Sequence, residues 1–309
     1  MGGLIMNAPT ISVIMLTYNR ENMVSHMIEC ILNQTFKDFQ FVIINNGSSD
    51  KSGEIAEEYA KKDSRIKVVH LTTSNISRGR NIGIDNATGK YVAFVDDDDE
   101  CDEDFLEFLY NLITENDADV AICGTTLKHF DEKFVMDNET AIETLLWRKY
   151  YNVGFPTKLI KKELYENNRF LEQTKYDDIY LAPKILAKAS KIAYHGLPKY
   201  IVNRHENNNS AWTQNHKLLD KATLKEYLEV YKNRTSYLCE KFPAKKATWE
   251  YFNWSFMISM VEKVVRLELQ NCEEELEYMK AELTYNKEKF LNCPEILDFE
   301  VEWVKEYIS

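Results

Sequence analysis

Short apolar runs alternate with amphipathic stretches over the first hundred residues of the chain. The runs are rich in β-branched and aromatic residues, as is typical of buried strands, and they occupy 11–16, 40–44, 66–69 and 91–95. Apolar residues at three- and four-residue steps predict a helix at 23–32, and capping residues precede another at 52–62. The basic stretch 77–87 predicts a loop and a short helix. Because strands that alternate with helices form βαβ units, the pattern predicts an α/β fold with a mainly parallel sheet.

Predicted strands and helices also follow one another in the second hundred residues, with longer polar segments between them. An apolar run predicts a strand at 119–123, a polar connection with a helix follows at 134–151, and 154–160 returns to the core. A further helix is expected at 179–189. These elements together predict one domain over 1–214.

From about residue 217 the chain becomes helical in pattern, which predicts an α-helical extension over 215–309. Six apolar residues recur at three- and four-residue steps and describe one face of a long helix, namely Trp249, Phe252, Phe256, Met260, Val264 and Leu267. A second helix is indicated at 273–291. We expect the apolar face to pack against the first domain or against a second copy of the chain, as a homodimer. Peripheral association with a membrane is the other interpretation, but the segment lacks the strongly basic face that binds anionic lipid.

Composition and charge narrow the class of protein. Of 309 residues, 44% are hydrophobic and 28% are charged, which is ordinary for a soluble globular protein. The net charge of −12 argues against a nucleic-acid binder, because affinity for the phosphate backbone comes from clustered Lys and Arg. No run approaches the about 20 apolar residues of a membrane span, and the start does not resemble a signal peptide. Six scattered cysteines without a CxxC pair predict free thiols, so we expect a cytoplasmic protein.

Four consecutive carboxylates, Asp96 to Asp99, follow the apolar run at 91–95. Their charges repel one another, so such a cluster favours a place where a cation or water offsets the charge. Mg²⁺ and Mn²⁺ prefer these oxygen ligands. The alternative is that the carboxylates complement the dipole of a helix at 103–113. A calcium loop fits less well, because Cys101 stands where its turn needs Gly and a strand rather than a helix precedes it.

Polar residues also follow the other predicted strands. Thr17, Asn45 and Asp96 each stand where an apolar run ends. In open sheets of this kind, ligands bind beyond the carboxyl ends of the strands. We therefore expect these three positions to share one crevice, although any α/β fold has polar loops after its strands.

Several motifs then occur in the order and spacing of a known family. From about residue 11 to about residue 210, the chain resembles family 2 glycosyltransferases, a large class of inverting enzymes that have the GT-A fold and use nucleotide-activated sugars. The segments that carry the resemblance are 11–20, 34–36, 41–50, 80–84, 87–91 and 94–99. The last segment contains the family's DxD pair, here Asp96 and Asp98. The resemblance implies little about the C-terminal part of the chain.

The resemblance implies that one group of residues binds a UDP-sugar, namely Thr17, Tyr18, Arg20, Asn45, Asn46, Arg80, Asp96 and Asp97. Tyr18 would offer its ring to the base. Arg80, with Arg78 nearby, would approach the diphosphate, because an Arg fork suits phosphate oxygens. Asn45 and Asn46 stand where the family usually has two Asp, and their amides can still pair with the edge of uracil.

The resemblance also implies a metal site and a general base. Asp98, with Asp96, would hold Mn²⁺ or Mg²⁺. Asp178 would take the proton of the acceptor hydroxyl, since it occupies the second position of the family's acidic pair. The alternative is that Asp178 only caps the helix that follows. Arg204 or His205 would reach the diphosphate or the metal from a segment that is mobile and basic in the family.

The resemblance thus implies a metal-dependent inverting hexosyl- or N-acetylhexosaminyltransferase. It would move a sugar from a UDP-sugar to a glycan or lipid-linked acceptor in surface polysaccharide synthesis, in the cytoplasm or at the inner face of the membrane. A nucleotidyltransferase is one alternative, but those enzymes usually have a Gly-rich phosphate loop after the first strand, and 16–21 contains no Gly. The other alternative is a nucleotide- or glycan-binding module without catalysis. This alternative stays open because Asn45 and Asn46 stand where the family usually has two Asp.

Overall fold

The computed structural model describes residues 8–172, 174–203 and 215–308. The chain divides into two compact units, 1–203 and 204–309, and each is described here by itself. The predicted boundary after residue 214 falls at the end of a segment outside the described residues, so it stays a prediction.

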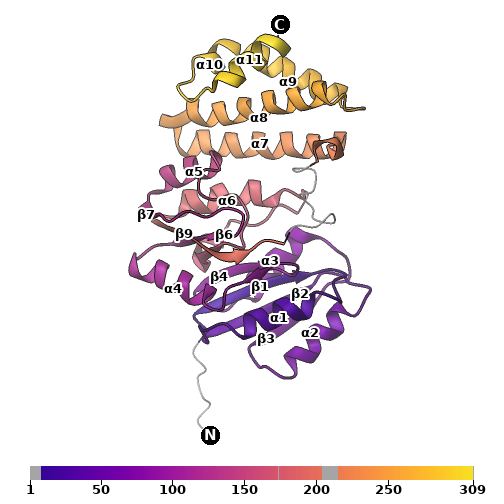
Figure 1. Ribbon diagram of the computed structural model, residues 1–309, viewed down its shortest axis with the longest axis vertical. Helices are drawn as coiled ribbons and strands as arrows, with labels where there is room; N and C mark the ends of the chain where they lie inside the picture. Colours follow the sequence, from indigo (N-terminus) through magenta and orange to yellow (C-terminus); the bar gives the residue numbers. More distant parts are fainter. Residues whose placement is uncertain (1–7, 173, 204–214, 309) are drawn as a thin grey trace. The chain divides into compact units, whose positions relative to one another are not determined.

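In the first half of the first unit, strands and helices alternate as the sequence predicts (Figure 1). These elements are β1 (Ile11–Thr17), α1 (Val24–Leu32), β2 (Phe39–Asn45), α2 (Ser52–Ala60), β3 (Ile66–His70), α3 (Ile76–Asn86), β4 (Tyr91–Asp96), β5 (Glu100–Cys101) and α4 (Phe105–Glu115). The remaining elements of the unit are β6 (Val120–Thr125), β7 (Lys133–Met136), α5 (Asn138–Leu146), β8 (Lys158–Lys161), α6 (Asp177–Lys188) and β9 (Ile192–Ile201).

The strands form one mixed sheet with helices on both faces. Within the described residues the sheet has nine strands in the order β3-β2-β1-β4-β8-β6-β9-β5, and β7 pairs with β9. Strands β3, β2, β1 and β4 run parallel, as predicted, whereas β8 lies antiparallel between β4 and β6. The carboxyl ends of β1, β2 and β4 therefore point to the same edge.

The two faces of β1 show how the alternation of its side chains places the helices. Val13 and Met15 belong to the buried core that includes residues of α1 and α4, whereas Ile14 points to the opposite face and meets α3. Gly83 of α3 packs so closely on Ile14 that a β-carbon there would overlap its side chain. A glycine at this position lets α3 lie directly against the sheet.

Three strands of this unit were not predicted. The ten-residue strand β9 contains Gly196 and Pro198, which interrupt the apolar pattern that marks a strand. Its register with β6 is irregular beyond Cys123, as expected of a bulge at such residues. Strand β7 occupies the start of the predicted polar connection, and β5 has only two residues. Short or interrupted strands carry too little periodicity to be recognised.

The second unit is helical, as predicted. It contains α7 (Lys221–Lys241), α8 (Lys246–Arg266), α9 (Glu273–Tyr285), α10 (Lys287–Leu291) and α11 (Asp298–Tyr307). The predicted apolar stripe lies on α8, but Tyr251 and Ile258, off that stripe, are fully buried as well. Because α8 packs against α7, α9 and α11, its apolar residues are used within the unit. The homodimer stays a prediction. No helix within the described ranges is both long enough and apolar enough to cross a membrane.

Asp119 joins three elements of the first unit. One carboxylate oxygen lies 2.6 Å from Nζ of Lys161 at the end of β8, and the other accepts hydrogen bonds from the hydroxyl and the backbone N–H of Ser190, before β9. Burial opposes ionisation, yet these bonds from Lys161 and Ser190 lower the pKa of Asp119 to about 2. The ionised carboxylate is thus stabilised in the folded chain.

We predict that Asp119→Asn lowers the free energy of unfolding at pH 7 by about 2 kcal/mol, because about two pKa units separate the folded and unfolded carboxyl. The loss should shrink as the pH falls from about 4 to about 2, where the wild-type carboxylate is protonated and its advantage disappears. Urea unfolding at several pH values measures this. Asp131→Asn, which changes an exposed carboxylate, serves as the control. If the difference in the free energy of unfolding between Asp119→Asn and the wild type did not change with pH, the ionised carboxylate would not be its source.

Candidate active site

The ends of three parallel strands meet at one edge of the sheet. Thr17 pairs with Asn45 across β1 and β2, and Leu16 pairs with Asp96 across β1 and β4. The predicted convergence of Thr17, Asn45 and Asp96 is thus confirmed. Thr17 is buried, whereas Tyr18 is 48% exposed, so its ring is accessible at this edge.

The four carboxylates form a turn directly after β4, which we call the acidic turn (Asp96–Asp99). The end of β9 holds this turn in place. The backbone N–H of Asp96 donates to the hydroxyl of the buried Tyr200 at 3.0 Å, and a carboxylate oxygen of Asp99 accepts from the backbone N–H of Asn203 at 2.8 Å. The amide of Asn203 also donates to the carbonyl of Asp98 at 3.1 Å. Strand β9, which the sequence did not reveal, therefore positions the carboxylates.

Arg20 faces the acidic turn. Its guanidinium lies 3.8 Å from a carboxylate oxygen of Asp97 and 3.5 Å from one of Asp98. Burial raises the pKa of Asp97 to about 7, and the charge of Asp98 adds to this effect. The hydroxyl of Thr17, buried beside this carboxylate, favours its ionised form and lowers the pKa. Burial and mutual repulsion thus make the carboxylates Asp96, Asp97 and Asp99 of this turn harder to ionise than exposed ones.

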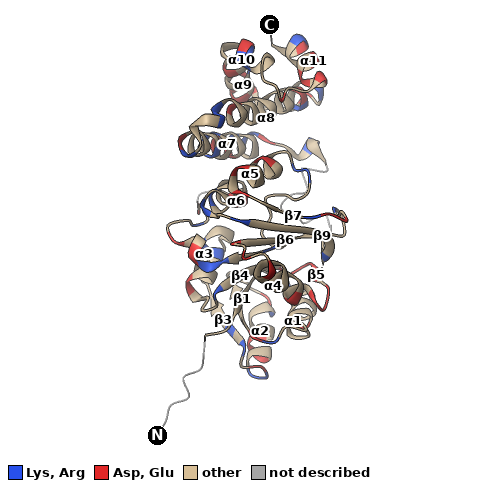
Figure 2. Cartoon of the chain, turned by 90° about the vertical axis from the view of Figure 1, so that its left-hand side faces the viewer, with Lys and Arg blue, Asp and Glu red and all other residues tan. Residues whose placement is uncertain are grey.

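Arg80 links the acidic turn to a helix much later in the chain. It lies on α3, a basic segment visible in Figure 2, and Nη1 lies 2.8 Å from Oδ1 of Asp177 in the first turn of α6. Its guanidinium also lies over the ring of Phe170, 5.2 Å from the centroid. Burial would lower the pKa of Arg80, but the charges of Asp177, Asp96 and Asp178 raise it. The guanidinium thus lies among carboxylates from β4 and α6.

Asp178, the predicted base, lies beside this pair. Burial raises its pKa, while Arg80, the backbone N–H of Ile179 and Lys158 oppose the shift. The side chain of Asp178 accepts from the N–H of the next residue, Ile179, at 2.8 Å, but it is not the cap of α6, because the N-cap residue is Tyr176 and no side chain among the described residues caps the helix. The charge of Asp178 also contributes to the raised pKa of Asp96. The carboxylate is thus near the acidic turn as well as at the start of α6.

Lys158 is a charged residue near the site that the sequence analysis did not single out. It is buried on β8, and its ammonium donates to the carbonyl of Asn152 at 2.9 Å and to the carbonyl of Gly154. Burial lowers the pKa of Lys158 to about 8, while Cys123 and Asp178 oppose the shift. A lysine in an apolar strand has no motif around it, so only the fold reveals that it lies near Asp178.

Asn45 and Asn46 are buried and bonded to neighbouring loops. The Asn45 amide nitrogen lies 3.0 Å from Nδ1 of His70, and its carbonyl accepts from the N–H of Ser48. The Asn46 carbonyl accepts from the N–H of Asn75, the N-cap residue of α3. Both amides therefore connect β2 to the loops at this edge, and their contact with a nucleotide stays a prediction.

Three further basic residues belong to the predicted set. Arg78, near Arg80, donates to the carbonyl of Thr73 at 2.7 Å and so holds the loop before α3. Arg204 and His205 lie outside the described residues, and their proposed contact with the diphosphate or the metal stays a prediction.

The acidic turn fits a hard divalent cation that takes few protein ligands. Asp96 and Asp98 place two carboxylates at one edge of the sheet, on either side of Asp97. No group of three or more His, Cys, Asp or Glu side chains in the described ranges forms a metal-binding cluster. Mg²⁺ typically takes only one or two carboxylates and completes its shell with water and substrate phosphate. These ligands therefore suit Mg²⁺ or Mn²⁺ better than a metal that needs a full shell of protein ligands.

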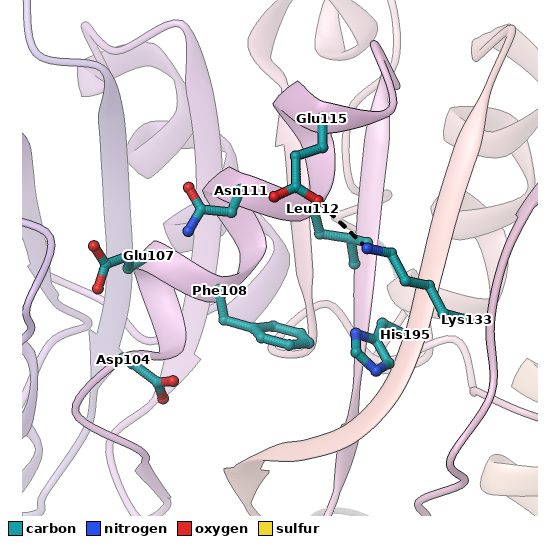
Figure 3. Close-up of a pocket in the computed structure, with 8 residues that line it drawn as sticks. All are labelled: Asp104, Glu107, Phe108, Asn111, Leu112, Glu115, Lys133 and His195. Carbon is teal, nitrogen blue, oxygen red and sulfur yellow. Dashed lines mark hydrogen bonds and ion pairs between the residues drawn. The ribbon is translucent and has the colours of Figure 1, made fainter.

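A separate cavity of about 300 Å³ lies between α4, β7 and β9 (Figure 3). Phe108 and His195 lie close together in it, with ring centroids 5.2 Å apart, and Lys133 pairs with Glu115. None of the predicted site residues lines this cavity. The site predicted from the sequence therefore lies at the edge of the sheet and is separate from this cavity.

The sequence pattern described as Glycosyl transferase family 2 matches residues 12–175, which is more than half of the chain. The chain therefore belongs to this family, and its mixed sheet with flanking helices has the GT-A fold. A solved structure of S. aureus TarS residues 1–349 in complex with UDP-GlcNAc is similar, with a TM-score of 0.62 and 18% identity over 94% of this chain and 95% of that one.

Two curated relatives illustrate the range of the family. Glycosyltransferase GlyA of Streptococcus pneumoniae is 33% identical over 231 residues, which are 68% of this chain and 33% of GlyA. The GalNAc(5)-diNAcBac-PP-undecaprenol beta-1,3-glucosyltransferase of Campylobacter jejuni is 34% identical over 176 residues, 53% of this chain and 56% of that protein. The match thus spans about a third of the length of GlyA and just over half of the C. jejuni protein.

We predict that Tyr200→Phe lowers the free energy of unfolding by about 1–3 kcal/mol, because the backbone N–H of Asp96 loses its acceptor in a buried place. Denaturant unfolding measures the change. The exposed Tyr18→Phe should leave the stability within about 0.5 kcal/mol of the wild type. Equal stability of Tyr200→Phe and wild type would contradict the role of β9 in holding the acidic turn.

Proposed function

We propose that the chain transfers a sugar from a UDP-sugar to a hydroxyl of a glycan or lipid-linked acceptor, with inversion at the anomeric carbon. One observation carries this proposal. The Arg80–Asp177 ion pair of 2.8 Å joins α3 to the start of α6, where Asp178 lies, and the charges of Asp96 and Asp178 both act on the same guanidinium. A carboxylate for the acceptor and carboxylates for a diphosphate-bound cation would then belong to one site.

The donor side would be built at the ends of β1, β2 and β4. The exposed ring of Tyr18 suits a nucleobase. Arg20 and Arg80 supply guanidinium groups that can turn from carboxylates to phosphate oxygens. Asp98 and Asp96 would hold Mn²⁺ or Mg²⁺, which when bound supplies positive charge to stabilise the leaving diphosphate. The family membership and the UDP-GlcNAc complex of TarS support a UDP-sugar as the first donor to test.

On the acceptor side, Asp178 would take the proton of the attacking hydroxyl. Because burial raises its pKa, the carboxylate is a stronger base than an exposed Asp, while Arg80 and Lys158 favour its ionised form. Attack from the side opposite the diphosphate then inverts the anomeric carbon. The C. jejuni relative is named for a glycan linked to undecaprenol, which supports a lipid-linked acceptor. Such an acceptor would be used at the inner face of a membrane for surface polysaccharide synthesis.

A second candidate is a nucleotide-binding module without catalysis. It is favoured by Asn45 and Asn46, which replace the family's usual acidic pair and bond to neighbouring loops. Such a module would bind UDP but would not turn over a UDP-sugar, so a change of Asp178 would have no effect on catalysis. The two candidate functions therefore predict different results for the variant Asp178→Asn.

We predict that UDP binding requires Mn²⁺ and that Asp98→Ala weakens it at least about tenfold, because one carboxylate of the metal site is lost. Calorimetry with and without Mn²⁺ measures both effects. Glu103→Gln, which neutralises an exposed carboxylate shortly after the turn, should bind like the wild type. Metal-independent binding, or unchanged binding by Asp98→Ala, would refute the metal site.

We predict that Asp178→Asn slows sugar transfer or donor hydrolysis by about 10²- to 10⁴-fold and leaves the affinity for UDP within about threefold. The amide cannot accept the acceptor proton, although it nearly preserves the shape of the side chain. Release of UDP from a panel of UDP-sugars measures turnover. A wild-type chain that binds UDP but turns over no donor, or no faster than Asp178→Asn, would favour the binding module.

A further inference from the structure

Two cysteines that lie far apart in the sequence meet beside the acidic turn. Cys30 on α1 and Cys101 on β5 are separated by 71 residues, yet their sulfur atoms lie 3.2 Å apart. The Cys30 thiol also lies 3.1 Å from the carbonyl of Cys101. Because the sulfurs of a disulfide are about 2.05 Å apart, a small movement would suffice to join them.

The surroundings hold this pair together. Gln34 is fully buried, and its amide donates to the sulfur of Cys101 at 3.4 Å and to the carbonyl of Asp102 at 2.8 Å. Its carbonyl accepts from the N–H of Leu106 at 2.9 Å. One glutamine after α1 thus fixes both β5 and the start of α4. The Cys101 thiol therefore cannot turn away from Cys30 without losing the hydrogen bond from this buried amide.

The two thiols differ in access and in acidity. Cys30 is half-buried, whereas Cys101 is 7% exposed, so a reagent from solvent reaches Cys30 first. The hydrogen bond from Cys101 lowers the pKa of Cys30 to about 7 against the effect of burial, and it raises the pKa of Cys101. Cys30 therefore has the properties of an attacking thiolate and Cys101 those of a resolving thiol.

We propose that Cys30 and Cys101 are a reactive dithiol site that accepts a low-molecular-weight disulfide and converts reversibly to an intrachain disulfide. The Cys30 thiolate attacks one sulfur of the reagent, so that a mixed disulfide forms and a first small thiolate departs. This thiolate takes the proton of the Cys101 thiol. The Cys101 thiolate then attacks the sulfur of Cys30 and releases a second small thiolate, which takes a proton from water. Two protein thiols are oxidised by two electrons, and one reagent disulfide is reduced to two thiols.

The disulfide would act on the acidic turn. Cys101 pairs with Tyr200 across β5 and β9, and the hydroxyl of Tyr200 accepts from the N–H of Asp96. Drawing β5 toward α1 therefore pulls on the contacts that hold the acidic turn. Weaker UDP binding by the oxidised chain follows from this, and this consequence alone rests on the proposed function.

Glutathione disulfide, followed by mass spectrometry of the non-reduced peptides, tests the proposal on the full chain. Wild type should yield a Cys30–Cys101 disulfide, while the half-buried Cys239 yields only a glutathione adduct, because its sulfur contacts a carbonyl at 3.9 Å instead of a second thiol. In Cys101→Ser the glutathione adduct on Cys30 should persist, because no thiol resolves it. Cys239→Ser should leave the intrachain disulfide unchanged. A lasting adduct on Cys30 in wild type, or no reaction at Cys30, would overturn the proposal.

Hydrogen exchange measures the link to the acidic turn without any ligand. The peptide over 94–105 should change its exchange on oxidation in wild type and in Cys239→Ser, but not in Cys30→Ser, and thiol reduction should reverse the change. Identical exchange in the two redox states of wild type would overturn the link. A chain that forms the disulfide and changes its exchange, but binds no UDP in either state, would refute the proposed function and leave this inference standing.

Discussion

The site depends on how the chain balances the negative charge of the acidic turn. Four consecutive carboxylates at a strand end repel one another, and burial adds to the cost of keeping them ionised. Arg20 offsets part of this charge from the loop after β1, and Arg80 does so from α3. Since Arg80 also pairs with Asp177, the same guanidinium fixes the start of α6. One ion pair thus joins α3 to the start of α6, 97 residues later in the chain.

This arrangement explains why the carboxylates differ in character. Asp96, next to Arg80, lies at the rigid end of a buried strand, whereas Asp99 is turned toward β9 and bonded to Asn203. Asp178 lies at the start of a helix, where a backbone N–H and two cations favour its charge. A carboxylate whose pKa is raised by burial, while two neighbouring cations limit the rise, suits a base for a hydroxyl proton. These three aspartates are the same residue type, but their surroundings give their carboxylates different acidity and different partners.

Much of the first half of the fold and the positions of the carboxylates could be predicted from the sequence. The apolar run before Asp96 places that residue at a strand end, because period and length mark the strand. The Arg80–Asp177 pair could not be predicted in this way, since 97 residues separate its partners and no periodicity links them. Strand β9 was missed because Gly196 and Pro198 break its pattern. The contact of Cys30 with Cys101 likewise depends on tertiary packing and not on a spacing motif.

A double-mutant cycle on Arg80 and Asp177 measures how strongly this ion pair joins α3 to α6. The free energy of unfolding would be measured for the wild type, Arg80→Met, Asp177→Leu and the double variant. Each single variant leaves a buried charge without its partner, so each should cost about 3–5 kcal/mol. The account predicts that the double variant loses less than the sum by about 1–3 kcal/mol. Additive losses would contradict the claim that this ion pair joins α3 to α6.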